Sequence, residues 1–197
     1  EMPIDGKTWW LWTFTGEQQT VYAIRKRRNS AVPEEILGKQ YKGIVTSDGH
    51  SVYRKMGSAQ QRCWAHIIRE SKALKEEHKL YACHHNNITK IFAKLKRIRA
   101  KPPPLEKRLE LKAQLEQDTI RIVDALDGHK EYRTFAVKLR NAIPALFTCL
   151  IHLFVEPTNN IAERALRELI VIRKIIGGLR RETGARTMET IVSMLAT

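Results

Sequence analysis

Short apolar runs with turn residues between them mark the first part of this 197-residue chain. The stretch KTWWLWTF is rich in aromatic and β-branched residues, TVYAIRK alternates apolar and polar residues, and TGEQQ between them is turn-like, so residues 7–28 read as two strands. Asp5-Gly6 is a strong two-residue hairpin signal, which predicts that the residues up to Ile4 end an earlier strand. SAVPEEILG then predicts a short helix, with Ser30 as its cap and Gly38 as its stop.

Strand-like and helix-like segments continue to alternate after this helix. KGIVTSDGHSVYRK contains an apolar strand from Gly43 to Ser47 that ends at Asp48. QQRCWAHIIRE predicts another strand around Cys63 and a helix that opens near Ala65. Strands followed by helices in this order favour an α/β sheet, antiparallel in its first hairpin and parallel afterwards.

A helical period replaces this alternation from about Ile68 to Asn141, which predicts an all-helical block. Its expected core positions are Ile88, Ile91, Phe92, Leu95, Ile98, Leu105, Leu109, Leu115, Ile122 and Leu126. The last part holds a helix starting near Asn160, the Gly- and Arg-rich loop RKIIGGLRRETGAR, and a closing helix from about Ala185 to Leu195. We therefore divide the chain into residues 1–67, 68–145 and 146–197.

The charge of the chain changes the expected partner. Lys and Arg number 35 against 21 Asp and Glu, a net charge of +14, and residues 67–145 alone carry 18 basic against 10 acidic residues. A basic excess favours polyanions, because neutralised phosphates release condensed counterions. Nucleic acid is the leading partner, ahead of a merely solvated basic surface or a membrane surface. The run KLKRIRAK is either a solvated helix face or a phosphate-contacting one.

Other observations narrow the class of protein. No apolar run approaches the roughly 20 residues of a membrane span, and the start lacks a signal-peptide pattern, so we expect a cytoplasmic protein without membrane contact. Phosphate-loop and dinucleotide-binding motifs are absent. Cys63, Cys83 and Cys149 form an odd set without disulfide spacing. A zinc site built from Cys63, His66, Cys83 and His84 or His85 stays open as an alternative.

Two carboxylates are candidates for chemistry. Phosphodiester cleavage is served by divalent cations, which take oxygen ligands, and clustered carboxylates at strand ends and helix starts can hold them. Asp48 ends a strand and precedes Gly49, although local sequence alone slightly favours a cap of the following helix. In EPTNNIAERALRELIVIRK, Asn160 and Glu163 have the spacing of a helix capping box, and Glu163 is also a candidate metal ligand.

These motifs together resemble a known family. SDGHSVYRKM, QRCWAHIIRE, DGKTWWLWTF and the segment from Glu156 to Thr197 resemble the catalytic core of the insertion sequence sixty-six family of bacterial transposases. The resemblance runs from Asp5 through Thr197 and is densest around residues 156–186. It implies an Asp-Asp-Glu enzyme with a ribonuclease-H-like mixed α/β sheet and an all-helical insertion between the second and third acidic residues.

The resemblance also implies roles for individual residues. Asp48 becomes the second acidic residue and Glu163 the third, both holding Mg²⁺ or Mn²⁺. His66, in a Cys-x-x-His element, becomes a residue on the substrate side of the site, and Asn160 shapes the turn before Glu163. DNA contacts are expected from the basic residues of the last part, namely Arg164, Arg167, Arg173, Lys174, Arg180, Arg181 and Arg186.

The first acidic residue of the family pattern is expected on the strand before the Asp5-Gly6 hairpin. Hairpin pairing places it just before Glu1, so we expect this polypeptide to be a fragment with little or no catalysis. The intact enzyme would act in DNA recombination and transposition on double-stranded DNA at element ends and target. A homo-oligomer, accessory transposition proteins and a place at the bacterial nucleoid are expected too. The alternative is a non-catalytic, basic nucleic-acid-binding module.

Overall fold

The computed structural model describes residues 1–196 and divides, by its internal packing, into two compact units. The first unit comprises Glu1–Lys39 and the chain from Asn160 onward, and the second comprises Gln40–Asn159. This division reflects internal packing and does not test the predicted domains 1–67, 68–145 and 146–197, which stay a prediction.

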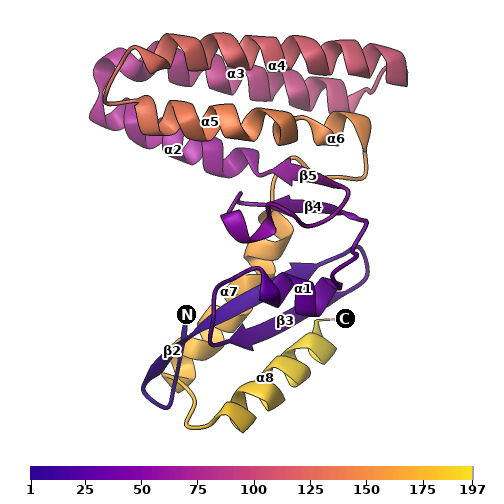
Figure 1. Ribbon diagram of the computed structural model, residues 1–197, viewed down its shortest axis with the longest axis vertical. Coiled ribbons are helices and arrows are strands. Elements are labelled where there is room, and N and C mark those ends of the chain that lie inside the picture. Colours follow the sequence, from indigo (N-terminus) through magenta and orange to yellow (C-terminus); the bar gives the residue numbers. More distant parts are fainter. Residues whose placement is uncertain (197) are drawn as a thin grey trace. The chain divides into compact units, whose positions relative to one another are not determined.

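The first unit contains an antiparallel sheet of β1 (Met2–Ile4), β2 (Lys7–Thr15) and β3 (Thr20–Arg25), in that order (Figure 1). Asp5 and Gly6 have φ angles of 49° and 68°, the positive values that a two-residue hairpin turn requires, and Ile4 pairs with Lys7. The predicted hairpin is therefore confirmed. Helix α1 (Ala31–Leu37) stops at Gly38 as predicted, although Ser30 makes no side-chain cap bond.

Two helices, α7 (Asn160–Ile176) and α8 (Glu182–Leu195), pack on this sheet. The buried side chains include Trp9, Ile24 and Ala185 in one cluster and Tyr22, Leu169 and Val192 in another. Hydrogen bonds fix the packing: the hydroxyl of Tyr22 donates to the carbonyl oxygen of Ala165 at 3.1 Å, and the backbone N–H of Ile24 donates to Glu189 at 2.8 Å.

The basic loop between these helices is attached to the sheet. The backbone N–H of Leu179 donates to the carbonyl oxygen of Pro3 at 2.9 Å, and the N–H of Asp5 donates to the carbonyl oxygen of Leu179 at 3.0 Å. Leu179 therefore occupies the outer edge of β1 in a parallel bridge. The loop residues on either side of Leu179 are held at a defined place in the first unit.

The second unit combines a two-stranded parallel sheet with helices (Figure 1). The strands are β4 (Ile44–Ser47) and β5 (Ala59–Arg62), with the short 3₁₀ helix η1 (Ser51–Tyr53) between them. The helices are α2 (Trp64–Glu77), η2 (Lys79–Tyr81), α3 (Ala82–Ala100), α4 (Leu105–Asp127), α5 (Arg133–Leu146) and α6 (Thr148–Ile151). The predicted parallel pairing and the predicted helical block are both present.

One continuous core holds these helices together, and most of the predicted core positions lie in it. Ile88, Ile91, Leu95, Leu115, Ile122 and Leu126 are buried. Leu105 and Leu109 were predicted wrongly, since they are 48% and 49% exposed. Helix direction alone does not explain this, because Leu105 lies about five full turns before Val123, which is buried; exposure at the start of α4 depends on how far the neighbouring helices cover it.

Polar contacts lock the start of α2 onto the end of α5. The indole N–H of Trp64 and the side-chain amide of Gln61 donate to the carbonyl oxygen of Leu146 at 2.8 and 3.0 Å. The backbone N–H of Cys149 donates to Gln61 at 2.9 Å. Leu146 is the last residue of α5, so its carbonyl oxygen has no N–H partner within the helix, and these two side chains supply the missing donors. The strand-to-helix corner is thereby fixed.

The chain is thus a mixed α/β protein, rich in helix, as predicted. Its described strands fall into one three-stranded and one two-stranded sheet, and the single ribonuclease-H-like sheet with a helical insertion stays a prediction. Among residues 1–196, one segment, Arg133–Ile151, is long and apolar enough by composition to span a membrane. Its apolar window is 56% buried inside the structure, which is the behaviour of a core helix.

Candidate active site

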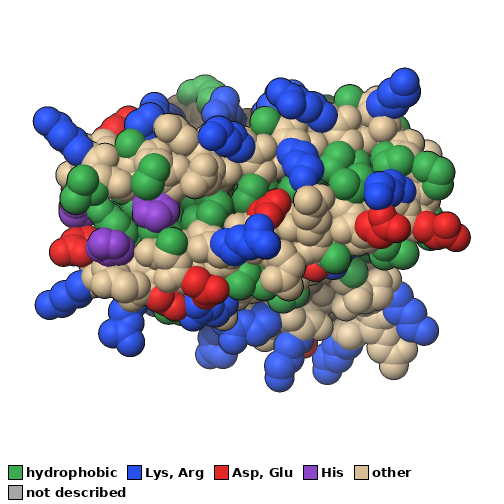
Figure 2. Space-filling view, turned by 90° about the horizontal axis from the view of Figure 1, so that it is seen from above, with side chains coloured by type: hydrophobic (Ala, Val, Ile, Leu, Met, Phe, Trp, Pro, Cys, Tyr) green, Lys and Arg blue, Asp and Glu red, His purple; other side chains and the backbone are tan. Residues whose placement is uncertain are grey.

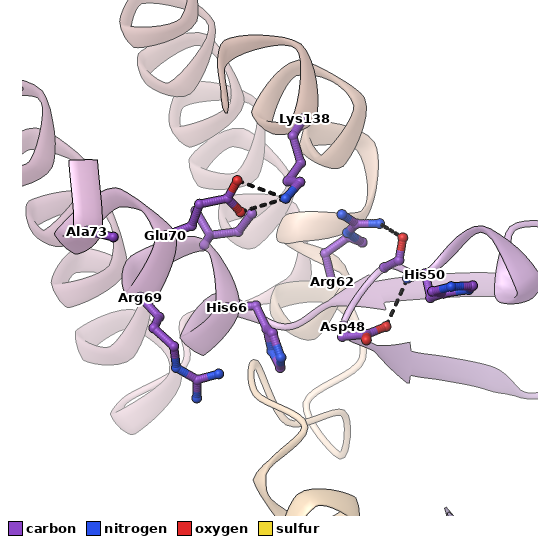
Figure 3. Close-up of a pocket in the computed structure, with 10 residues that line it drawn as sticks. Asp48, His50, Arg62, His66, Arg69, Glu70, Ala73 and Lys138 are labelled. Carbon is purple, nitrogen blue, oxygen red and sulfur yellow. Dashed lines mark hydrogen bonds and ion pairs between the residues drawn. The ribbon is translucent and has the colours of Figure 1, made fainter. Parts of the chain in front are cut away.

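A cleft in the second unit brings together residues from two strands and two helices (Figure 3). It has a volume of about 460 Å³ and lies where the parallel strands β4 and β5 end and α2 begins. Its lining residues are Asp48, Gly49, His50, Arg62, His66, Ile67, Arg69, Glu70, Ala73 and Lys138. Ligands of α/β proteins commonly bind at this carboxyl edge of parallel strands.

Asp48 lies at the exposed rim of this cleft, directly after β4. Its Oδ1 accepts a hydrogen bond of 2.8 Å from the backbone N–H of His50, so the carboxylate orders the turn that follows the strand. The cap of η1 is His50, whose Nδ1 accepts from the N–H of Val52 at 3.4 Å. Asp48 is therefore no helix cap, and its carboxylate, with about four acceptor positions, keeps capacity for a further ligand.

Arg62 places a half-buried positive charge behind Asp48. Its Nη1 donates to the carbonyl oxygen of Gly49 at 2.6 Å. Gly49 has φ +89°, which strains any other residue, and a Cβ atom there would lie 1.5 Å from Arg62 Cζ, so a side chain at this position would displace the guanidinium. Burial lowers the pKa of the Arg62 guanidinium, while the carboxylates of Asp48 and Glu70 act in the opposite direction. Arg62 carries no sequence motif that would have marked it as a site residue.

One face of α2 forms the opposite wall. His66, Glu70 and Ala73 follow each other at helical spacing, and Arg69 lies beside them. The ammonium of Lys138, from α5, donates to both oxygens of Glu70 at 2.8 and 2.7 Å. Glu70 and Lys138 were also missed. The spacing from His66 could have indicated Glu70, whereas Lys138 comes from a separate helix and gives no local signal.

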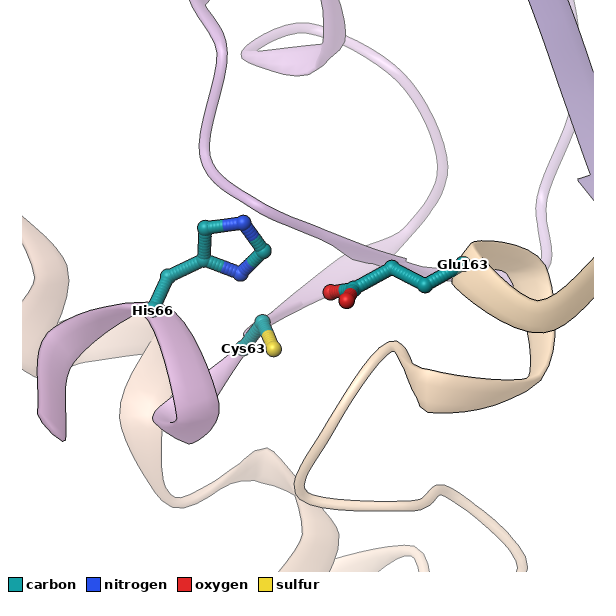
Figure 4. A group of neighbouring side chains, drawn as sticks. All are labelled: Cys63, His66 and Glu163. Atoms are coloured by element: carbon teal, nitrogen blue, oxygen red, sulfur yellow. The ribbon is translucent and has the colours of Figure 1, made fainter. Parts of the chain in front are cut away.

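Cys63 and His66 lie at the start of α2, as the Cys-x-x-His spacing predicted (Figure 4). Cys63 is buried, and its Sγ accepts a hydrogen bond of 3.2 Å from the backbone N–H of Asn159. The next residue, Trp64, donates its backbone N–H to the carbonyl oxygen of Pro157 at 3.0 Å. The Pro-Thr-Asn turn that leads into α7 is thereby tied to the first turn of α2. His66 itself lines the same cleft as Asp48.

The alternative zinc ligands are engaged elsewhere. Cys83 is exposed on α3, His85 Nδ1 lies 3.0 Å from the hydroxyl of Ser71, and His84 packs against Tyr81 and Tyr132. Burial lowers the pKa of both His84 and His85. Within residues 1–196, no cluster of three metal-ligating side chains includes Cys83, His84 or His85. The structure therefore does not bring this zinc set together.

The remaining predicted residues lie in the first unit. Helix α7 begins at Asn160, and Glu163 is the acidic residue of its first turn (Figure 4), a favourable place for negative charge at a helix N-terminus. Arg164, Arg167, Lys174, Arg180 and Arg181 are exposed and Arg173 is half-buried. Arg186 differs from them, because it pairs with Glu189 at 3.2 Å and with Glu182 at 3.9 Å.

Comparison with protein families identifies the chain as a transposase. The matching model, described as the Transposase IS66 family, covers residues 2–187, and the chain therefore belongs to that family. No curated protein and no solved structure matches the chain. The resemblance drawn from the sequence motifs is confirmed at the level of the family, and membership implies a DNA substrate and a nuclease or transposition activity for the family.

Proposed function

We propose that this chain is the catalytic core of a DNA transposase that uses Mg²⁺ or Mn²⁺ to hydrolyse phosphodiester bonds at element ends and to join the freed 3′ hydroxyl to a target. One observation carries the proposal. Asp48 and His66 line a single cleft at the carboxyl edge of parallel strands, in a chain that belongs to a transposase family. In this proposal Asp48 and Glu163 hold the metal.

The residues fit such a metal. Mg²⁺ takes hard oxygen ligands, and Asp48 offers an exposed carboxylate with acceptor positions left after its bond to His50. When bound, the ion would activate the attacking oxygen and offset charge on the leaving oxygen. The cleft contains two carboxylates, Asp48 and Glu70. Glu70 is paired with Lys138, whereas Asp48 forms no ion pair within the second unit and is therefore the better candidate for a metal ligand.

Covalent continuity supports the part assigned to Glu163. Asn159 is held to Cys63 by its backbone N–H, and Glu163 follows it by four residues in a helix that starts at Asn160. Four residues of helix rise only about 6 Å. The backbone of Glu163 therefore lies within a short distance of Asn159, which is bonded to Cys63 at the start of α2. We propose that the Glu163 side chain reaches the cleft from there.

The basic groups of the cleft are proposed to hold DNA phosphates. Arg62 and Arg69 lie on the two walls beside Asp48 and His66, and guanidinium groups suit phosphate oxygens. His66 would orient the scissile phosphate by hydrogen bonding through its imidazole. The exposed arginines and lysine of α7 and the loop after it would position the flanking backbone, without reading sequence. Coordinated cutting of two ends would need a homo-oligomer.

The testing experiment is a divalent-dependent nicking and strand-transfer assay on DNA that carries the element ends. Because the family pattern includes a further Asp, the assay is run on this chain and on a chain extended upstream. We expect Asp48→Asn and Glu163→Gln each to reduce activity about a hundredfold, because even the outer-shell partners of metal ligands contribute roughly 10- to 100-fold. The exposed Glu131, which has no ion pair among the described residues, gives the matched control Glu131→Gln.

A different outcome would favour the alternative function. Salt-sensitive DNA binding without any divalent-dependent cleavage, unchanged by Asp48→Asn, is the behaviour of a non-catalytic binding module. Cleavage that survives Glu163→Gln would remove Glu163 from the proposed metal site.

A further inference from the structure

Among the helices of the second unit, α3 has the largest net positive charge. Helix α3 carries Lys and Arg residues but no Asp or Glu, whereas α4, its partner in the hairpin, carries Glu106, Glu110, Glu116, Asp118, Asp124 and Asp127. The space-filling view onto these helices shows Lys and Arg side chains projecting around the rim (Figure 2). If these helices were simply solvated, we would expect acidic and basic residues to occur together on both of them.

Four of these cations form one stripe, which we call the α3 stripe: Lys90, Lys94, Arg97 and, just beyond the helix end, Lys101. Their spacing of four, three and four residues keeps them on a single helix face. That face is turned by roughly 120° about the helix axis from the one that buries Ile88, Ile91 and Leu95 in the core. The stripe is about 16 Å long at 1.5 Å per residue.

The other cations of the hairpin have structural partners. Arg99 donates to the carbonyl oxygens of Cys149 and Leu153 at 2.6 and 3.1 Å, and Arg108 donates to those of Leu150 and Ile151 at 2.7 and 2.9 Å. Lys96 lies over the ring of Phe92. These residues hold the α6 region against α3 and α4, so their charge is explained by the fold.

The α3 stripe has no such explanation. Within residues 1–196, none of its four members forms an ion pair, and the one side-chain bond joins Lys94 to the uncharged Gln114 at 3.2 Å. By contrast, Lys107, Lys112 and Arg121 on α4 have carboxylates at 2.5, 2.6 and 3.2 Å. Keeping four like charges in one row without counter-charges is unfavourable unless an anionic partner is bound.

We propose that the α3 stripe binds the phosphate backbone of duplex DNA, as a contact surface additional to the active-site cleft. The choice of DNA rests on the proposed function. A row about 16 Å long spans about five phosphates of one strand at 3.4 Å per phosphate along the duplex axis. A lipid surface fits less well, because membrane-binding helices present large exposed apolar residues beside their cations, and α3 has none among its described residues.

The test compares two variants with the same change in net charge. The stripe variant carries Lys90→Gln, Lys94→Gln, Arg97→Gln and Lys101→Gln. The control variant carries Lys107→Gln, Lys112→Gln, Arg121→Gln and Arg140→Gln, which removes four cations of the same block that have acidic partners. Affinity for a duplex of about 30 base pairs is measured without divalent ions between 50 and 200 mM salt, and circular dichroism checks the fold.

We expect the stripe variant to lose about a hundredfold in affinity near 100 mM salt, and its plot of log affinity against log salt to flatten by about 3 to 4. The control variant should change either quantity much less. Equal losses in both variants would overturn the proposal, because they would reflect net charge alone. An unchanged stripe variant, or a stripe-dependent preference for duplex RNA or anionic vesicles over DNA, would overturn it as well.

This test can fail independently of the proposed catalysis. If the stripe variant binds DNA normally while Asp48→Asn abolishes cleavage, the stripe proposal is wrong and the catalytic one stands. If the stripe variant loses DNA binding but cleavage is unchanged by Asp48→Asn, the stripe proposal stands and the catalytic one is wrong.

Discussion

The backbone N–H of Asn159 donates a 3.2 Å hydrogen bond to the Sγ atom of buried Cys63, joining residues 96 positions apart. Beside it, the N–H of Trp64 donates to the carbonyl oxygen of Pro157. The two bonds fix the turn before α7 on the first turn of α2. The turn that precedes Glu163 is thus positioned by the Cys-x-x-His segment that also places His66.

Cys63→Ala should lower the free energy of unfolding by about 1 to 3 kcal/mol, because it leaves a half-buried N–H without its acceptor and removes a buried sulfur. Cys63→Ser keeps an acceptor and should cost less. Chemical denaturation followed by circular dichroism measures both. The exposed Cys83 provides the control, and a Cys63→Ala variant as stable as Cys83→Ala would show that the bond to Asn159 is unimportant.

Gly49→Ala should destabilise the second unit by about 1 to 3 kcal/mol and displace Arg62 from the cleft wall, because Gly49 has φ +89° and a Cβ atom there would overlap the guanidinium. Gly128→Ala is the matched control, since Gly128 has φ −69° and no atom within 4 Å of the added Cβ. Thermal unfolding compares the two. Equal melting temperatures would mean that the Gly49 turn tolerates a side chain.

Tyr22 couples stability to alkaline pH in the first unit. Burial first, and then the carboxylate of Glu168, raise the pKa of Tyr22 from 10.0 to about 12. Between these values the unfolded state loses the phenol proton before the folded state does. The stability that comes from the protonated Tyr22 hydroxyl is therefore fully present below about pH 10 and is lost as pH rises toward about 12.

Tyr22→Phe should therefore cost about 1 kcal/mol at pH 7, through the lost bond to Ala165, and should lose less stability than the wild type between pH 10 and 12. Unfolding free energies measured across this range check the sign. The exposed Tyr41 gives the control Tyr41→Phe. Parallel pH curves for Tyr22→Phe and the wild type would contradict the account.

Local chemistry explains which elements were predictable. Asp5-Gly6 determines its own turn, and a helical period defines α3, because both signals lie within a few neighbouring residues. The exposure of Leu105 and Leu109 could not be predicted as easily, since it depends on which arc of α4 the neighbouring helices cover. The distribution of strands between two sheets is likewise a property of long-range packing.

The candidate site shows the same limit. Asp48 and His66 were accessible to prediction because one ends an apolar strand and the other opens a helix, and the structure brings both into one cleft. Arg62, Glu70 and Lys138 were missed because their place in the cleft depends on contacts across the fold, such as the bond from Arg62 to Gly49 and the ion pair between α2 and α5. In a chain with many charged residues, the neighbouring sequence does not show which of them make such long-range contacts.

The most direct test of the central claim, that Asp48 and Glu163 hold one metal, is a double-mutant cycle for Mn²⁺ affinity measured by calorimetry and electron paramagnetic resonance. We expect Asp48→Asn and Glu163→Gln each to weaken Mn²⁺ binding at least about tenfold, with the double variant little weaker than either single one, because the two side chains act as a unit. Glu131→Gln should bind as the wild type does. Losses that simply add, or Mn²⁺ binding unaffected by either substitution, would contradict a shared site.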